Sequence, residues 1–228
     1  MPENRFFLNK PLQNGISVEL EDEEFHHLKV MRCSIGDQVE LVNGKNQLGV
    51  AQVTQLDKHK AILHIIELQE HPTPKRKIIL ALSYLRPKNL DLVIEKGTEL
   101  GATAFWLFPG QRSEKDSLTP NQLERLQHLA ISALKQCGRL DLPEIIQMPE
   151  LKSWKTPPPG ELYWGDPKST TPFKPTTATT FFIGPEKGFS KEEENILQST
   201  FHAKGITLNP NVLRAETAAL CAIALAAY

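Results

Sequence analysis

The sequence has few cysteines and no long apolar run. Its three cysteines, Cys33, Cys137 and Cys221, are odd in number, far apart and without a CxxC pair, which argues against a disulfide framework. No segment approaches the roughly 20 consecutive apolar residues that a membrane span needs. The segment MPENRFFLNK lacks the apolar stretch of a secretory signal. We therefore expect a reduced, cytoplasmic protein that does not span a membrane.

Phosphate-binding and metal-binding motifs are also missing. There is no GxGxxG after the first buried strand and no GxxxxGK[ST] anywhere, so dinucleotide and nucleoside triphosphate sites lack their usual signature. His26 and His27 have no second ligand pair at zinc spacing. The sequence therefore predicts no metal and makes a dinucleotide-dependent enzyme a weak alternative.

Charge is nearly balanced overall but not along the chain. The net charge is −1 over 228 residues. Residues 1–70 hold 7 Lys and Arg against 11 Asp and Glu, a net of −4, whereas residues 71–228 hold 19 against 16, a net of +3. The mildly basic larger part permits a nucleic-acid partner without requiring one.

The first 70 residues have the pattern of short strands. Val-, Ile- and Leu-rich segments alternate with Gly, Asn and Asp, which is typical of strands joined by turns. These segments are 15–20, 37–44, 47–56 and 61–68. Between the first two, Phe25, Leu28 and Met31 or Arg32 recur at helical spacing. We predict a small β-barrel with one short helix.

After a basic, proline-containing linker at 70–77, apolar strands alternate with helices. Continuously apolar segments predict strands that are buried on both faces, at 78–85, 102–109 and 179–184. Amphipathic or Ala-rich segments predict helices, at 87–101, 120–138, 190–201 and 212–228. Shorter strand-like pieces lie at 161–166 and 205–209. This alternation indicates a parallel α/β sheet.

Two loops of this part lie where an α/β sheet binds its ligands, beyond the carboxyl ends of strands. They are residues 184–189 (GPEKGF) and 209–214 (NPNVLR). Gly184 and Gly188 would let the backbone approach something flat and uncharged, such as an adenine ring. A purely structural turn is the alternative, because Gly-Pro pairs often end strands.

A capping box is predicted just after the first of these loops. Ser190 is followed by Glu193 three positions later, and this pair typically fixes the start of a helix. The helix is therefore expected to begin directly after the loop.

Several charged or polar residues lie at the ends of predicted elements. Arg112 follows a strand, Arg139 follows a helix, and Arg214, Glu216 and Thr217 begin the last helix. Each position also has a structural explanation. A solvated loop follows Arg112, a helix dipole would favour Arg139, and first-turn capping would explain Glu216 and Thr217.

Taken together, these segments resemble one family. The resemblance is carried by RFFL (5–8), EFHHLKVMRCSIGDQVEL (24–41), EKGTELGATAFWLF (95–108), RS (112–113), QCGR (136–139), IGPEKGFS (183–190) and LNPNVLRAETAAL (208–220). In order and spacing they are similar to the bacterial 16S ribosomal RNA (uracil-N3) methyltransferases of the SPOUT class. The chain differs from the usual motifs at Lys187, where the family usually has glycine, and at 208–211, where this chain has Leu-Asn-Pro-Asn and the family usually has Leu-Gly-x-Arg.

The resemblance implies two domains, a fold and a cofactor. Residues 1–72 would form a PUA-like RNA-binding β-barrel, and residues 73–228 an α/β domain whose C-terminal segment is threaded into a trefoil knot. The knot would bring the two loops together to bind S-adenosylmethionine, and it would form the interface of a homodimer. The implied cofactor-binding residues are Phe108, Ile183, Gly184, Pro185, Glu186, Gly188, Leu208, Leu213, Arg214 and Thr217.

The implied reaction is methylation of N3 of a specific uridine in 16S rRNA of the small ribosomal subunit. N3 must lose a proton, and negative charge develops on the neighbouring carbonyl oxygens, so a base and a positive group are needed. The catalytic candidates are Arg112, Arg139 and Glu216. RNA phosphates would be contacted by Arg5, Arg32, Lys75, Arg76, Lys77, Arg86 and Lys88.

Two further functions remain open from the sequence. One is a related knotted methyltransferase that acts on tRNA or on a ribose 2′-hydroxyl. The other is an RNA-binding or ribosome-assembly protein without catalysis, for which the differences at Lys187 and Asn209 are the motivation.

Overall fold

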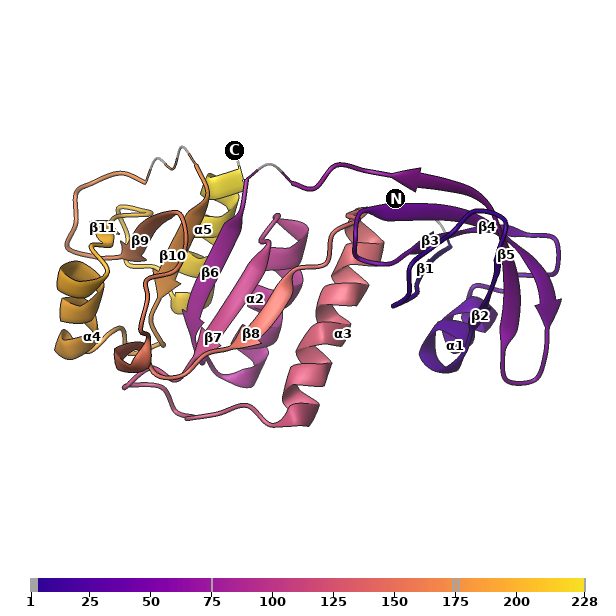
Figure 1. The fold of residues 1–228 in the computed structure, drawn as a ribbon. Coiled ribbons are helices and arrows are strands. Elements are labelled where there is room, and N and C mark those ends of the chain that lie inside the picture. Colours follow the sequence, from indigo (N-terminus) through magenta and orange to yellow (C-terminus); the bar gives the residue numbers. More distant parts are fainter. Residues whose placement is uncertain (1–3, 75, 174, 176, 228) are drawn as a thin grey trace. The chain divides into compact units, whose positions relative to one another are not determined.

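The computed structural model describes residues 4–74, 76–173, 175 and 177–227, which fall into two compact units (Figure 1). Unit 1 consists of Met1–Pro74 and Ile131–Leu142, and unit 2 of Lys75–Ala130 and Pro143–Tyr228. Unit 1 is thus discontinuous in sequence, and no pattern in residues 131–142 indicated that they pack with the N-terminal strands.

Unit 1 is a five-stranded sheet that curls around an apolar core (Figure 1). Its strand order is β1-β3-β4-β5-β2, with β1 parallel to β3 and the other pairs antiparallel. Register shifts in β4 after Val50 and Val53 are bulges, which strengthen the twist of a sheet. The elements are β1 (Arg5–Phe7), β2 (Ser17–Leu20), α1 (Asp22–Val30), β3 (Gln38–Val42), β4 (Gln47–Leu56) and β5 (Ala61–Glu70).

The segment 131–142 is held in unit 1 by a buried ion pair and by close backbone packing. Lys135 Nζ lies 2.6 Å from Glu24 Oε1, and both side chains are largely buried. Leu142 N donates to Gly44 O at 2.9 Å. A Cβ on Gly44, which has φ +71°, would lie 2.7 Å from Leu142 Cβ. Glycine at position 44 therefore allows both the positive φ of the turn and the close approach of the segment 131–142.

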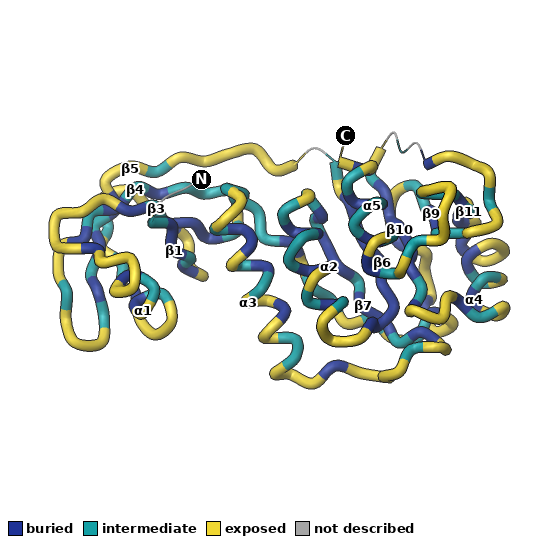
Figure 2. The backbone as a smooth tube through the Cα atoms, turned by 180° about the vertical axis from the view of Figure 1, so that it is seen from behind, coloured by how far each residue is buried: buried dark blue, intermediate teal, exposed yellow. Residues whose placement is uncertain are grey.

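Unit 2 is a six-stranded sheet of order β11-β9-β10-β6-β7-β8 in which every pair is parallel. All residues of β6 and β10 are buried, and Figure 2 shows β6 and β7 as predominantly buried segments. The prediction of a parallel α/β sheet from continuous apolar runs is confirmed. The strands are β6 (Ile78–Ser83), β7 (Ala104–Phe108), β8 (Glu144–Gln147), β9 (Glu161–Gly165), β10 (Thr179–Ile183) and β11 (Lys204–Ile206).

The helices follow the predicted spans with one difference. Residues 190–201 form only a short α-helix, which then widens into the π-helix η2. No sequence pattern predicted β1, β8 or the 3-10 turn η1, which are only three or four residues long. The helical elements are α2 (Pro87–Glu99), α3 (Pro120–Cys137), η1 (Leu151–Ser153), α4 (Lys191–Asn195), η2 (Ile196–Thr200) and α5 (Ala215–Ala227). Among the described residues, no helix has both the length and the apolar character needed to cross a membrane.

The last helix returns from the edge of the sheet to its middle. It follows the edge strand β11, yet it packs against α2, β6 and β10, behind the sheet in the view of Figure 1. The connection 207–214 must therefore pass the carboxyl end of β10. This is the return path that the implied threaded segment requires.

We expect Gly97→Ala to destabilise unit 2. A Cβ at Gly97 would lie 2.8 Å from Phe105 Cε1 and 3.0 Å from Ile223 Cδ1, and both of these side chains are buried. Overpacking of this kind costs about 1–3 kcal/mol, more than the roughly 1 kcal/mol by which alanine is the better helix former. Urea unfolding would measure the loss, with Lys88→Ala on the exposed side of α2 as control. Unchanged or increased stability of Gly97→Ala would contradict this packing.

Candidate functional site

A cavity of about 760 Å³ lies in unit 2 beyond the carboxyl ends of the strands. Its walls come from the segments that follow β6, β7, β9, β10 and β11. Both loops predicted from sequence, 184–189 and 209–214, contribute to it. A cavity of this volume suits a small-molecule or cofactor ligand.

The loop 184–189 is a tight turn in which each glycine has a distinct role. Gly188 N donates to Pro185 O at 2.7 Å, and Gly188 has φ +70°, a conformation that favours glycine. A Cβ on Gly184 would lie 2.9 Å from Phe189 N. Lys187 is not among the described residues with positive φ. A lysine at this position therefore fits the turn without backbone strain.

A carboxylate ties this turn to the start of α2. Glu186 Oε1 accepts hydrogen bonds from Arg86 N at 2.9 Å and from Asn89 Nδ2 at 3.2 Å. The first N–H groups of a helix have no partner within the helix, and their positive end favours an anion. Glu186 thus provides the hydrogen-bond acceptor at the N-terminus of α2 and holds one wall of the cavity in place.

The loop after β7 forms a second tie. Arg112 Nη1 donates to Lys187 O at 3.2 Å, which places this arginine at the cavity. Ser113 Oγ donates to Tyr84 O at 3.0 Å at the end of β6. Burial raises the pKa of Tyr84, so its phenol stays neutral at physiological pH. The strand ends of β6, β7 and β10 are thereby joined through polar contacts.

Two buried polar atoms of cavity-lining residues have no hydrogen-bond partner within the described part of the chain. They are Trp164 Nε1, at the end of β9, and Glu216 Oε2, in the first turn of α5. Buried donors and acceptors are nearly always paired. Both residues contribute to the wall of the same cavity, whereas the two atoms themselves have almost no exposed surface.

The structure brings most of the predicted cofactor residues together and leaves two apart. Phe108 is fully buried and packs against the Trp154 ring with centroids 5.6 Å apart, and Thr217 is exposed on α5; neither lines the cavity. The predicted residues that do line it are Ile183, Gly184, Pro185, Glu186, Gly188, Leu208, Leu213 and Arg214.

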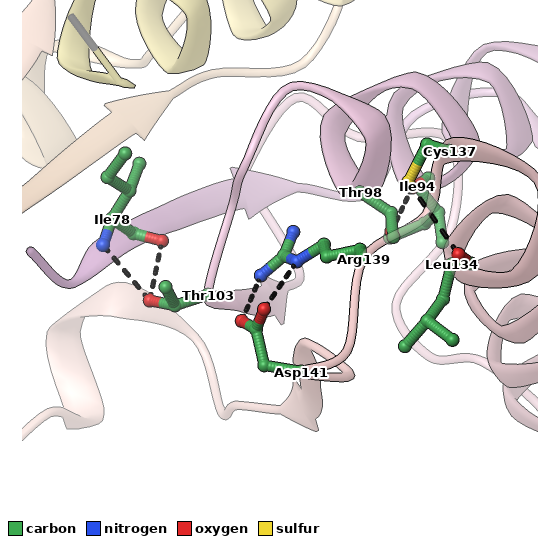
Figure 3. A network of polar contacts seen from close by, with 8 residues as sticks. All are labelled: Ile78, Ile94, Thr98, Thr103, Leu134, Cys137, Arg139 and Asp141. Atoms are coloured by element: carbon green, nitrogen blue, oxygen red, sulfur yellow. Dashed lines mark hydrogen bonds and ion pairs between the residues drawn. The ribbon is translucent and has the colours of Figure 1, made fainter. Parts of the chain in front are cut away.

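Of the three catalytic candidates, Arg112 and Glu216 line the cavity and Arg139 does not. Arg139 belongs to unit 1. Its guanidinium points toward the carboxylate of Asp141 (Figure 3), with Nη2 2.5 Å from Oδ2 and Nε 3.0 Å from Oδ1. Arg139 followed a predicted helix end, but sequence position alone could not show that a carboxylate two residues later holds its charge.

The predicted RNA-binding residues differ in how far they are engaged within the protein. Arg5 is 7% exposed and ion-paired with Glu40, and Arg76 donates to a backbone carbonyl of α5. Arg86 Nη2 lies 2.7 Å from Glu114 Oε1, and this hydrogen bond is the main cause of the lowered pKa of the Glu114 carboxyl. The remaining side chains, Arg32, Lys77 and Lys88, are exposed, and Lys75 lies outside the described residues.

The cavity wall that follows β9 was not among the segments predicted from sequence. Trp164, Gly165 and Asp166 line the cavity, but they belong to a Pro- and Thr-rich stretch that offered only one strand-like piece. The predicted strand 161–166 ends at Asp166, and the carboxyl end of this strand was the signal that could have indicated a wall of the site. Within the described ranges, no group of three or more His, Cys, Asp and Glu side chains could hold a metal ion.

Comparison with known families identifies both parts of the chain. Residues 71–227 match the family described as RNA methyltransferase domain, and residues 20–66 match the RNA methyltransferase PUA domain.

Similar proteins match over nearly the whole length. The ribosomal RNA small subunit methyltransferase E of Rickettsia conorii is 28% identical, with 98% of this chain and 95% of the relative covered. The protein of the same name from Aquifex aeolicus is also 28% identical, with 93% and 95% covered.

Two solved structures share the fold. Ribosomal RNA small subunit methyltransferase E from Neisseria gonorrhoeae, bound to S-adenosyl methionine, aligns with a TM-score of 0.87 and 29% identity, covering 98% of this chain and 95% of that one. A Legionella pneumophila methyltransferase in complex with the same cofactor aligns with a TM-score of 0.87 and 28% identity, covering 99% and 97%.

We expect Glu186→Ala to lower the free energy of unfolding by about 1 kcal/mol, because it removes the acceptor at the start of α2. Lys187→Ala changes the neighbouring exposed side chain of the same turn and keeps the Lys187 carbonyl, so its effect should stay within about 0.5 kcal/mol. Urea unfolding of both variants provides the comparison. Equal stability of the two would mean that Glu186 does not hold the turn.

Proposed function

The chain belongs to the RNA methyltransferase family, and from this premise we propose that it methylates N3 of a uridine in 16S rRNA with S-adenosylmethionine as methyl donor. One observation supports this most strongly. The two loops that the family resemblance brings together, 184–189 and 209–214, are walls of a single cavity. Relatives that match over nearly the full length are named ribosomal RNA small subunit methyltransferase E.

The cavity has the features that a bent nucleoside ligand needs. Gly184 and Gly188 bring the backbone close to its interior, where N–H and C=O groups can read a base. Trp164 and Glu216, whose Nε1 and Oε2 atoms have no partner in the described chain, also line this cavity. When bound, S-adenosylmethionine would supply an electrophilic methyl group on a sulfonium, whose bond from sulfur to the methyl carbon breaks so that the sulfur leaves as the neutral thioether of S-adenosylhomocysteine. The residues proposed to hold it are Ile183, Gly184, Pro185, Glu186, Gly188, Leu208, Leu213 and Arg214.

Glu216 is the proposed acceptor of the uridine proton. The N3–H bond must break as the bond from N3 to the methyl carbon forms, and the proton needs a base within reach. Glu216 is 9% exposed, lines the cavity and has an oxygen without a partner. Its carboxylate can therefore take the proton without first breaking a hydrogen bond at that oxygen.

Arg112 is the proposed group that stabilises the charge on the uracil carbonyl oxygens. One of its N–H groups is held by Lys187 O, and a guanidinium has five N–H donors in a fixed plane. The remaining donors can therefore act on an oxygen as negative charge develops. Arg112 is preferred over Arg139 because Arg112 lines the cavity and Arg139 is paired with Asp141.

The proposed RNA partner is 16S rRNA or the small subunit, which implies action in the cytoplasm. The match of residues 20–66 to the RNA methyltransferase PUA domain supports an RNA contact through unit 1. Exposed Arg32, Lys77 and Lys88 are the side chains best able to meet phosphates.

A homodimer formed through unit 2 is the proposed assembly. Leu92 on α2, Leu100 at its end and Leu225 on α5 are 39%, 37% and 44% exposed, and the two helices pack against each other. Exposed large apolar side chains on neighbouring elements often mark a protein interface.

Mass spectrometry of rRNA would test the function directly. In cells without this protein, 16S rRNA should lack one methyl group on a uridine, and the purified protein with S-adenosylmethionine should restore it. Free 16S rRNA, small subunits and tRNA would be offered in parallel. Methylation of tRNA or of a ribose hydroxyl instead would refute the proposed target, and no methylation of any RNA would refute the enzyme.

We expect Gly188→Val to lower the affinity for S-adenosylmethionine at least 10-fold while the protein stays folded. Valine resists φ +70°, so the turn that forms the cavity wall must change at a strain of about 1–3 kcal/mol. Gly36→Val imposes similar strain at φ +97° in unit 1 and should leave the affinity unchanged. Calorimetry would decide, and equal affinities for Gly188→Val and wild type would remove the turn from the site.

We expect Leu225→Glu to convert a dimer into monomers, because it places a charge at an exposed apolar position of α5, the helix that packs beside α2. Sedimentation velocity would show the change in mass. Lys88→Glu, at an exposed position of α2, is the control and should remain dimeric. A wild-type protein that sediments as a monomer would refute the assembly.

A further inference from the structure

Glu193 is a buried carboxylate that the proposed mechanism does not use. Its exposed fraction is 2%, and a glutamate is rarely buried to that extent unless its oxygens are paired. Oε2 accepts from Ser190 N at 2.8 Å, and Glu193 N donates to Ser190 Oγ at 3.1 Å. This confirms the predicted capping box at the start of α4.

The other oxygen of Glu193 binds a distant part of the chain. Oε1 accepts from Gln111 N at 3.0 Å. Gln111 belongs to the loop after β7 and directly precedes Arg112. One side chain therefore joins the start of α4 to the backbone that carries the cavity arginine.

The capping box alone does not explain a glutamate here. The box needs one acceptor oxygen for the N–H of Ser190, and glutamine serves this role as well as glutamate. A second acceptor for Gln111 N is available only from a carboxylate, because a glutamine amide would place its own N–H groups there. The contact with Gln111 is thus the one that requires the negatively charged side chain.

The loop after β7 is consequently fixed on both sides of Arg112. Its backbone is held at Gln111 by Glu193, and the Arg112 guanidinium is held by Lys187 O at 3.2 Å. Ser113 Oγ accepts from Gly110 N at 3.2 Å within the same loop. Glu193 and Lys187 belong to one continuous segment, 184–193, so the segment that forms the cavity wall also sets the place of the arginine.

We infer that Glu193 is a positioning residue for methyl transfer, acting through the backbone of Gln111 on the guanidinium of Arg112. This inference rests on the proposed function of the cavity. Glu193 itself does not line the cavity. Its loss should therefore slow the chemical step through Arg112 and leave the binding of S-adenosylmethionine nearly intact.

A double-mutant cycle tests this route. Glu193→Gln should lower kcat about 10-fold, since small displacements of a reacting group have effects of this order or larger. Its Kd for S-adenosylmethionine, measured by calorimetry, should stay within about 3-fold. In the Arg112→Ala background the same substitution should lower kcat less than about 2-fold. A full 10-fold loss in that background would overturn the inference.

Three controls separate positioning from stability. Ser190→Ala removes the cap oxygen but keeps the Glu193 contact with Gln111, so it should lower the melting temperature and leave kcat unchanged. Lys191→Gln neutralises an exposed charge on the same helix and should change neither. Amide hydrogen exchange is measured on the wild-type protein, so this test does not depend on whether a variant folds. The Gln111 amide should be protected as strongly as the Glu193 amide. A freely exchanging Gln111 amide would overturn the inference even if Glu193→Gln does not fold.

The outcomes also distinguish the inference from the function on which it rests. Wild-type protein that methylates no RNA would overturn both. Active wild type with an equally active Glu193→Gln would overturn the positioning role alone and leave the proposed function standing.

Discussion

The site depends on the common direction of the six strands of unit 2. Because every strand pair is parallel, all the carboxyl ends meet at one edge, and segments far apart in the sequence become neighbours there. The return of α5 to the middle of the sheet adds the last wall, since it carries residues 207–214 past the end of β10. Both loops contribute walls to the same cavity.

Two carboxylates hold these loops in place through hydrogen bonds. Glu186 joins the turn 184–189 to the start of α2, and Glu193 joins the start of α4 to the loop that carries Arg112. Both accept hydrogen bonds from backbone N–H groups, which are stronger than neutral hydrogen bonds because the acceptor is charged. Glu186 and Glu193 therefore serve the architecture of the cavity.

Much of the fold could be predicted from sequence because it rests on local patterns. Continuous apolar runs identified β6, β7 and β10, and the Ser190–Glu193 pair identified the start of α4. Elements of three or four residues, such as β1 and β8, carry too few side chains for a period to be recognised. The α-helical spacing of apolar residues does not predict the π-helical turn at Ile196–Thr200. For the site, the glycine turns marked the position of the walls, but Trp164 and the pairing of Arg139 with Asp141 depend on contacts that only the folded chain shows.

The discontinuity of unit 1 has a consequence for the order of events during synthesis. The strands of this unit are complete at residue 70, but Lys135, which neutralises Glu24, and Leu142, which fills the space above Gly44, come much later in the chain. A nascent chain must therefore expose an unfinished N-terminal sheet until some 70 further residues have left the ribosome, a delay of a few seconds to about 15 seconds at ordinary elongation rates. A fragment that ends at the linker would keep that defect permanently.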